Sequence, residues 1–465
     1  MRHYLGLSEY HFRQKKQNLP QFYEPGRLIN GHLLLAGMSG TGKSWQSMRW
    51  MESAAQAGLE LDVFDVHDEL DGIAGATACR YSQATGYGFN PLELDTDPHT
   101  GGVNRQVDYL LNLLKSVTRQ LGSKQEACLR HLLQDTYAMS GIWPDNANSW
   151  QRDRINETQR RQMVEARQWS QLRQFYPTLD DLMSFGRRKL QVLVIGGDNK
   201  SVSALDQLQK AFRRLSGLQG RFARGGSDDE REKLQKQIEG AKTQCVGQYT
   251  EFVENMQSGR ELDDVLKYDS VDVLTSAMQR LELLNAAGIF RANPPPFGDS
   301  KVRVHQLKSL TAEQQVMFVK LRLQAIFDRC KRAGATRSGT ELRQVVFLDE
   351  GHKYFSKEPD DIINVIAKEA RKFGLGLWCA SQSPTEFPEA FLTNVGATAL
   401  LGIHSRYWPD AQRMLRCSED TLHYTKPKEV ITVKFQREGQ ADPPWQNIIV
   451  PNPGNPAGVA AAGFR

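Results

Sequence analysis

An octapeptide near the start of the chain constrains the fold more than any other stretch of the sequence. Residues 37–44 read Gly-Met-Ser-Gly-Thr-Gly-Lys-Ser and match the pattern G-x-x-x-x-G-K-[ST]. An apolar run precedes them at 32–36, and residues 45–51 have a helical composition. A strand, a glycine-rich loop and a helix in this order form a phosphate-binding loop, because backbone N–H groups and the positive end of the helix face the phosphate.

The residues of this loop have separate expected roles. Lys43 is expected to reach the outer phosphates, and the hydroxyl of Ser44 is placed to ligate Mg²⁺. ATP and Mg²⁺ are therefore the expected cofactors. The residues expected to hold the nucleotide are Gly37, Ser39, Gly40, Thr41, Gly42, Lys43 and Ser44.

A second apolar strand supplies the groups that hydrolysis requires. Residues 345–348 are followed by Asp349 and Glu350. With a phosphate-binding loop upstream, this pattern predicts Asp349 in the Mg²⁺ shell and Glu350 as the base that orients and deprotonates the attacking water. Gln382 ends the next predicted strand, where its side chain either contacts the γ-phosphate or the water, or caps the turn before Pro384.

Charge that develops on the γ-phosphoryl group calls for a cation besides Lys43. Arg371 precedes the strand that ends at Gln382, and it is the first candidate for this catalytic role if subunits form a ring. Lys372 and Arg406 are the alternatives. Each of the three could equally be a surface cation.

Polar residues also follow the predicted strand at 61–67. Asp65, His67 and Glu69 have the spacing D-x-H-x-E at a strand end, where α/β sheets place ligand-binding residues. Whether any of the three is functional stays open. His67 has no partner ligands spaced around it, which favours a hydrogen-bonded polar group over a metal ligand.

Changes in composition and in hydrophobic periodicity divide the chain into five segments. Helical periodicity dominates the third segment, although residues 191–196 could form a strand there. The first segment is an arm that packs on a neighbour or a ligand, or a solvated lead-in. The predicted segments are the N-terminal arm 1–31, the first part of an ATPase core 32–100, a mostly helical insert 101–290, the second part of the core 291–450 and a flexible tail 451–465.

Composition restricts the compartment and the partners. No apolar run approaches the roughly 18–20 residues of a membrane helix, and the start of the chain has no signal-peptide pattern. The six cysteines show no paired spacing, which favours a reduced cytoplasm and no structural zinc. The net charge of +5 is compatible with nucleic acid without requiring it. We expect a cytoplasmic protein, peripheral if it serves a membrane-bound machine.

In this order the motifs resemble the HerA/FtsK superfamily of RecA-like motor ATPases, and most closely its HerA branch and the conjugative-transfer ATPases of type IV secretion. The resemblance covers roughly 30–110 and 285–440. It implies an α/β fold, a RecA-like P-loop core with a mixed, largely parallel sheet, plus an all-α insert. The stretches that carry it are 37–44, 65–69, 88–92, 347–350, 371–374 and 381–384.

The resemblance further implies a homo-oligomeric ring, usually hexameric, with ATP between subunits and DNA moving through the pore. Arg371 matches an arginine that acts between subunits, and Gln382 matches a sensor. Val66 and Asp68 depart from the D-P-H-G-E pattern of HerA-like proteins. Little chain precedes the loop, so we expect a motor that depends on a protein partner for targeting.

Two other functions stay open at this point. One is an ATPase that powers a type IV secretion or conjugation machine through protein partners. The other is a ring that scaffolds and activates a nuclease or other effector in phage defence. A nucleotide-gated switch with negligible turnover is disfavoured by Glu350, because a switch does not need a catalytic base.

Overall fold

A computed structural model provides the coordinates. Ser383, in the motif at 381–384, and Gly196, at the end of the possible strand 191–196, lie outside the described residues. The structure describes residues 1–117, 121–195, 200–225, 228–255, 267–268, 271–337, 341–382, 384–440, 442–454 and 456–463.

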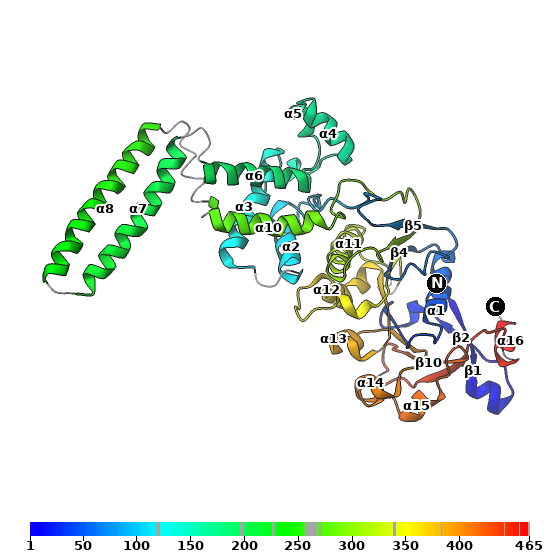
Figure 1. Ribbon diagram of the computed structural model, residues 1–465. Coiled ribbons are helices and arrows are strands. Elements are labelled where there is room, and N and C mark those ends of the chain that lie inside the picture. The colour runs from blue at the N-terminus through cyan, green and yellow to red at the C-terminus, as the bar shows by residue number, and fades with distance from the viewer. Residues whose placement is uncertain are drawn as a thin grey trace. The chain divides into compact units, whose positions relative to one another are not determined.

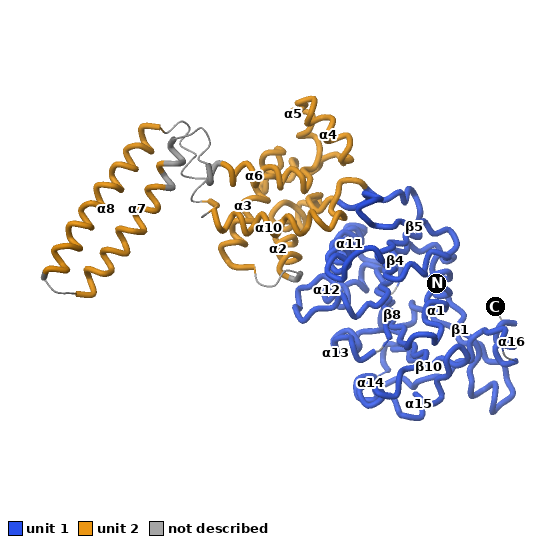
Figure 2. The backbone as a smooth tube through the Cα atoms, viewed as in Figure 1, with its two compact units in different colours: residues 1–89, 294–465 blue, residues 90–293 orange. Residues whose placement is uncertain are grey.

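The chain divides into two compact units, which Figure 2 shows in different colours. Unit 1 comprises residues 1–89 and 294–465, and unit 2 comprises residues 90–293. Unit 1 contains the phosphate-binding loop and the strand that precedes Asp349, whereas unit 2 is helical.

Among the described residues, unit 1 holds an 11-stranded sheet in the order β2-β1-β11-β10-β9-β3-β8-β7-β4-β6-β5. Figure 1 labels β1, β2, β4, β5 and β10 of this sheet. The seven strands from β9 to β5 run parallel, and the remaining four pair antiparallel. This confirms the predicted mixed, largely parallel sheet. The strands are β1 (His3–Ser8), β2 (Pro20–Tyr23), β3 (Leu33–Ala36), β4 (Glu60–Asp65), β5 (Ala76–Arg80), β6 (Val302–Gln306), β7 (Gln344–Leu348), β8 (Leu375–Ser381), β9 (Ala397–Leu400), β10 (Val430–Phe435) and β11 (Gln446–Ile449).

Helices cover both faces of the sheet, so its central strands are buried on both sides. Every residue of β3, β7 and β8 is buried, as is usual for parallel strands. Trp50 of α1 packs with Leu33 and Val63 on one face, while Phe318 of α11 meets Phe64 on the other. The helices of unit 1 are η1 (His11–Lys15), η2 (Pro25–Arg27), α1 (Lys43–Gln56), α11 (Ala312–Arg332), η4 (Gly351–Tyr354), α12 (Ile362–Glu369), η5 (Ala370–Phe373), η6 (Pro384–Glu386), α13 (Glu389–Leu392), η7 (Ser405–Tyr407), α14 (Trp408–Leu415), α15 (Glu419–Tyr424) and α16 (Pro456–Ala462).

Unit 2 is an assembly of helices, in agreement with the predicted all-α insert. Its two longest helices, α7 and α8, pack antiparallel as a hairpin through Leu215, Leu218 and Ile238 (Figure 1). None of the described helices in either unit is long and apolar enough to cross a membrane. The helices of unit 2 are α2 (Val103–Val117), α3 (Ser123–Met139), η3 (Ala147–Ser149), α4 (Glu157–Glu165), α5 (Trp169–Leu172), α6 (Leu179–Ile195), α7 (Lys200–Ala223), α8 (Asp228–Asn255) and α10 (Val271–Ala286).

Three local expectations differ from the structure. Within the expected arm 1–31, β1 and β2 extend the sheet, because Leu5 and Leu7 are buried and Leu7 pairs with Ile449. The expected flexible tail contains α16, and Ala461 accepts a hydrogen bond from Tyr4 at 2.8 Å. Residues 191–195 of the possible strand are instead the last turn of α6, because adding residues to a formed helix costs little once the helix has started.

A polar network lies inside the face that α11 covers. Asp62 of β4 is fully buried and accepts hydrogen bonds from Arg303 at 2.7 and 3.0 Å, His305 at 3.1 Å and Gln344 at 2.7 Å. Burial raises the pKa of Asp62, but the bonds from His305 and Arg303 outweigh it and hold the carboxyl ionised. His305 thus uses its Nε2 proton on Asp62, and its Nδ1 accepts from the Tyr81 hydroxyl at 2.8 Å.

Two buried histidines should make the fold sensitive to acid. Nδ1 of His32 accepts a hydrogen bond from the Leu377 N–H at 2.9 Å, as that of His305 does from Tyr81. Burial lowers the pKa of each ring to about 4, whereas an unfolded histidine titrates near 6.5. The stability that these two histidines contribute is therefore complete above about pH 6.5 and falls as the pH drops toward 4. We expect a loss of about 1 kcal/mol per histidine between pH 7.5 and 5.5 in urea unfolding.

Replacing one of these rings isolates its share of the effect. His32→Asn keeps an acceptor near the Nδ1 position but does not titrate, so its unfolding free energy should depend less on pH. His423→Asn is the control, because His423 is exposed. Equal pH dependence in His32→Asn and wild type would contradict this explanation.

Candidate nucleotide-binding site

Four neighbouring parallel strands bring four of the predicted motifs to the carboxyl-terminal edge of the sheet. In the order β3-β8-β7-β4, their carboxyl ends are followed by the phosphate-binding loop, Gln382, Asp349 with Glu350, and the stretch 65–69. Ligands of open α/β sheets bind at this edge. Residues that are more than 300 positions apart in the sequence are therefore gathered by the strand order alone.

Backbone contacts fix the phosphate-binding loop at both neighbouring strands. Gly37 N–H donates to the Ser381 carbonyl at 3.0 Å, and Met38 N–H donates to the Gly402 carbonyl at 2.9 Å. A Cβ at Gly37 would lie 2.6 Å from the hydroxyl oxygen of Thr41, so only glycine fits there. Gly42, with φ of 93°, ends the loop in the left-handed region and precedes α1.

The middle of the phosphate-binding loop is open to solvent, where a ligand could reach it. Ser39 and Gly40 are exposed, while Thr41 is buried and its hydroxyl donates to the Met38 carbonyl at 2.8 Å. Ser44, in the first turn of α1, donates to Oε2 of Glu69 at 3.1 Å. The loop thus presents backbone amides and the Ser44 hydroxyl at the start of a helix, where anions bind.

Lys43 and Glu350 meet across the intervening strand β8. Nζ of Lys43 lies 3.0 Å from Oε1 of Glu350. Strands two places apart are separated by about 10 Å, which these two long side chains span together. The residue expected to bind phosphate and the residue expected to act as a base therefore share one location.

The electrostatics of the two acids after β7 differ. Burial raises the pKa of Glu350, but the hydrogen bond and charge of Lys43 outweigh it, so the net pKa lies below its usual value. Burial raises the pKa of Asp349 to about 6, despite the nearby charge of Lys43. Glu350 is thus a carboxylate ready to accept a proton, and Asp349 is an acid whose ionised form a cation would stabilise.

The stretch after β4 contacts both motifs. Nε2 of His67 lies 3.8 Å from Oδ2 of Asp349, and Glu69 holds Ser44 as described above. Asp65 is buried and accepts from the backbone N–H groups of His67 and Leu70 at 3.1 and 2.8 Å. Asp65 therefore shapes the turn, whereas His67 and Glu69 border the predicted metal ligands.

The remaining predicted residues separate into two groups. Gln382 is exposed at the carboxyl end of β8, level with the loop, because Ala36 pairs with Ser381. Arg371 lies on η5, before the start of β8, and forms an ion pair with Glu438 at 3.3 Å. Lys372 and Arg406 are exposed.

Three polar residues around Glu350 were not singled out for a role in the sequence. His352 follows Glu350 by two positions, and it contacts Ser381 at 3.0 Å and Glu386 at 3.4 Å. A histidine so close to a predicted base is a usable signal. Its link to residues 381–386 depends on β8 lying beside β7, which the sequence does not reveal.

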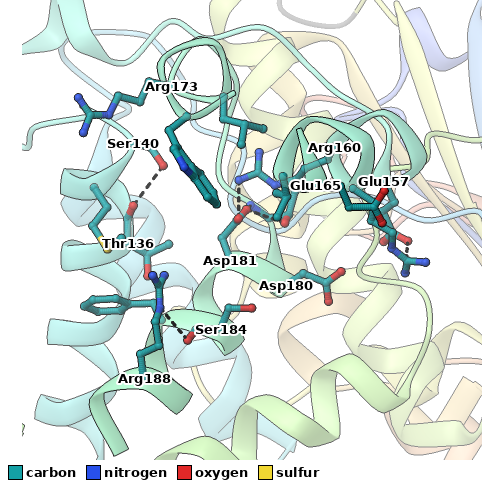
Figure 3. Close-up of a pocket in the computed structure, with 17 residues that line it drawn as sticks. Thr136, Ser140, Glu157, Arg160, Glu165, Arg173, Asp180, Asp181, Ser184 and Arg188 are labelled. Carbon is teal, nitrogen blue, oxygen red and sulfur yellow. Dashed lines mark hydrogen bonds and ion pairs between the residues drawn. The ribbon is translucent and has the colours of Figure 1, made fainter. Parts of the chain in front are cut away.

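Unit 2 has a cavity of about 750 Å³ that contains none of the predicted site residues. It lies among residues of α3, α4, α5 and α6. Figure 3 shows Arg160 and Asp181 joined by an ion pair and Arg188 turned toward Ser184. Its acids and arginines are present in equal number, so its charge favours no ligand of one sign.

The residues at the carboxyl ends of the central strands fit a nucleotide with bound Mg²⁺. The phosphate-binding loop, whose close packing requires glycine at position 37, offers backbone N–H donors. Lys43 offers a positive charge to the outer phosphates. Ser44 and Asp349 offer the oxygen ligands that Mg²⁺ prefers. The bound cation would neutralise phosphate charge. The chain itself would position the phosphates and hold Glu350 beside them.

An α/β sheet in which β8 separates the loop-bearing strand β3 from the acid-ending strand β7 is the RecA-like P-loop class of fold. Among solved structures, the chain is similar to VirB4 of Thermoanaerobacter pseudethanolicus, with a TM-score of 0.59 and 15% identity over 97% of this chain and 96% of that chain. This likeness confirms the fold that the motifs implied.

Two other solved structures are less similar to the chain. The bacterial conjugative coupling protein TrwBdeltaN70 matches with a TM-score of 0.45 and 11% identity, over 92% of this chain and 85% of that one. The genome packaging NTPase B204 from Sulfolobus turreted icosahedral virus 2, in complex with AMPPCP, matches with a TM-score of 0.25 and 13% identity, over 34% of this chain and 78% of that one. No protein-family model matches the sequence, and no curated protein matches it significantly.

Proposed function

We propose that this protein hydrolyses ATP with Mg²⁺ and acts as a homo-oligomeric ring motor that translocates DNA. The observation that carries the proposal is the 3.0 Å contact between Lys43 of the phosphate-binding loop and Glu350 after β7. A phosphate-binding cation beside an ionised carboxylate is what in-line attack of water on a γ-phosphate needs. Asp349 and Ser44 are the proposed Mg²⁺ ligands.

The position of Arg371 supports a ring. Arg371 precedes β8, whereas the phosphate-binding loop lies level with the end of that strand. Seven residues of β-strand span about 20 Å, so Arg371 lies at the opposite edge of the sheet from its own loop. A catalytic role for this arginine therefore requires the nucleotide of a neighbouring subunit. Gln382, at the loop edge, is the proposed sensor within the same subunit.

The decisive experiment measures ATP turnover with and without duplex DNA, on protein whose oligomeric state is determined by mass photometry. We expect an oligomer whose turnover rises several-fold with DNA at low salt and loses that rise at moderate salt, because salt weakens binding to phosphates. Lys43→Ala is the control without turnover. An active oligomer that ignores DNA at every salt concentration would contradict DNA translocation while leaving ATP hydrolysis intact.

The second candidate is an ATPase that drives a secretion or conjugation machine through protein partners. The motifs shared with conjugative-transfer ATPases favour it, together with the likeness to VirB4 along 97% of the chain. The same assay separates the two candidates. Turnover that rises only when a membrane-machine component is added would favour the second.

A further inference from the structure

A small polar cluster lies behind the proposed base. His352 on η4, Ser381 at the end of β8 and Glu386 on η6 come from three elements of unit 1. Nδ1 of His352 lies 3.0 Å from Oγ of Ser381, 3.4 Å from Oε2 of Glu386 and 3.6 Å from Oε2 of Glu350. One ring nitrogen therefore faces two carboxylates and a hydroxyl.

The hydrogen bonds of Ser381 determine which nitrogen of the His352 ring carries the proton. Oγ of Ser381 donates its single hydrogen to Oε2 of Glu386 at 2.9 Å. At its 3.0 Å contact with His352 the hydroxyl oxygen can then only accept, so Nδ1 must carry the proton. Burial lowers the pKa of His352, which keeps the ring neutral at neutral pH. The neutral Nδ1–H tautomer therefore presents its positive edge to the carboxylate of Glu350.

The carboxylate of Glu350 is consequently held from both sides. Lys43 contacts Oε1 at 3.0 Å, and the N–H edge of His352 faces Oε2. The backbone of Glu350 lies in the left-handed region, with φ of 47°, where few non-glycine residues settle unaided. A hydrogen bond from Lys43 at one oxygen and the positive ring edge of His352 at 3.6 Å from the other both favour this direction of the carboxylate.

The cluster also joins the base to the phosphate-binding loop by a second route. The carbonyl of Ser381 accepts from Gly37 N–H at 3.0 Å, and its hydroxyl contacts His352. A closed circuit of contacts thus runs from Gly37 through Ser381, His352 and Glu350 to Lys43. Ser381 directly precedes Gln382, so a displacement of the end of β8 would also move His352 and change the position of Glu350.

We propose that His352 is a positioning residue, which orients Glu350 through its Nδ1–H and ties it to Ser381 at the end of β8. The inference rests on the proposed ATP hydrolysis. In this proposal His352 acts through Glu350 and not on the nucleotide directly. The rival explanation is that His352 only fills space beside Phe387, whose ring it meets edge-on with centroids 6.3 Å apart.

Three substitutions separate these explanations. Asparagine places an N–H near the Nδ1 position, glutamine places one near Nε2, and alanine has none. We expect His352→Asn to keep kcat within about 3-fold of wild type. His352→Gln and His352→Ala should lose about 10–100-fold in kcat with KM unchanged, because a misplaced base reacts slowly although the nucleotide still binds. In a Glu350→Gln background, His352→Ala should cost nothing further.

His423→Ala, at an exposed histidine, is the matched control and should leave kcat unchanged. Thermal unfolding of each variant shows whether a loss reflects folding. His352→Asn as impaired as His352→Ala would overturn the proposal. So would a loss in His352→Ala that tracks its loss of thermal stability.

The tautomer can be measured without turnover. In protein labelled with ¹⁵N-histidine and assigned through His352→Asn, we expect the Nδ1 of His352 to be protonated and its Nε2 unprotonated. We also expect its resonance to shift in Glu350→Gln. A ring protonated on Nε2 would overturn the inference. Failure of the proposed function has a different signature, namely that wild type and Glu350→Gln hydrolyse ATP equally poorly while this tautomer persists.

Discussion

Glu350→Gln should nearly abolish ATP turnover while leaving ATP binding intact. The amide keeps the size of the side chain and can accept a hydrogen bond, but it cannot take a proton from water. General-base catalysis contributes about 10²–10⁴-fold, and we expect a fall in kcat of that order. The contact from Lys43 weakens to a neutral one, which leaves the lysine available for phosphate.

The measurement pairs phosphate release with equilibrium binding of a fluorescent ATP analogue. Glu358→Gln is the matched control, because Glu358 is an exposed carboxylate nearby in the chain. We expect wild-type turnover from that control. Normal turnover in Glu350→Gln would contradict the assignment of the base, and lost binding would point to a structural role.

Arg371→Ala should have an effect of similar size. A cation supplied to the γ-phosphate by another subunit contributes about 10³–10⁵-fold in related chemistry, so turnover should fall by about 10³-fold or more. ATP binding should be retained, because the nucleotide-binding groups of each subunit remain. Glu438→Gln, which removes the ion-pair partner of Arg371, should leave most turnover intact.

Mixing subunits tests whether the arginine acts in trans. Rings that combine Arg371→Ala subunits with Lys43→Ala subunits contain some interfaces where an intact loop faces an intact arginine. We expect those rings to recover part of the turnover that neither variant has alone. Mixed rings as inactive as each parent would argue against action between subunits and, given the distance of Arg371 from its own loop, against a catalytic role for this arginine.

Much of unit 1 was predictable because its signals are local. The loop at 37–44 and the strand before Asp349 each carry their own pattern, and a P-loop upstream restricts what the second pattern means. These stretches, with the strand that ends near Gln382, were sufficient to predict the class of sheet. The roles assigned to individual residues stay predictions.

The parts that the sequence did not reveal depend on long-range pairing. The strand character of β1 lies in only six residues, and its pairing partner β11 lies at the far end of the chain. The contact between His352 and Ser381 likewise exists only because β7 and β8 are neighbours. The hydrophobic periodicity of a short sequence window cannot show which strands are neighbours in the sheet. At 191–196 the apolar run suited both strand and helix, and the preceding turns of α6 decided between them.

The pairing of β3 has a consequence for synthesis of the chain. Both partners of this wholly buried strand, β8 and β9, emerge from the ribosome only after residue 375. At about 5–20 residues per second, β3 stays unpaired for roughly 20–70 s. The loop that follows it can adopt its shape only at the end of that interval, since Gly37 and Met38 donate to residues 381 and 402. Nascent chains should therefore expose an apolar segment for most of translation and depend on chaperones, and a truncated chain that ends before β8 should not bind nucleotide.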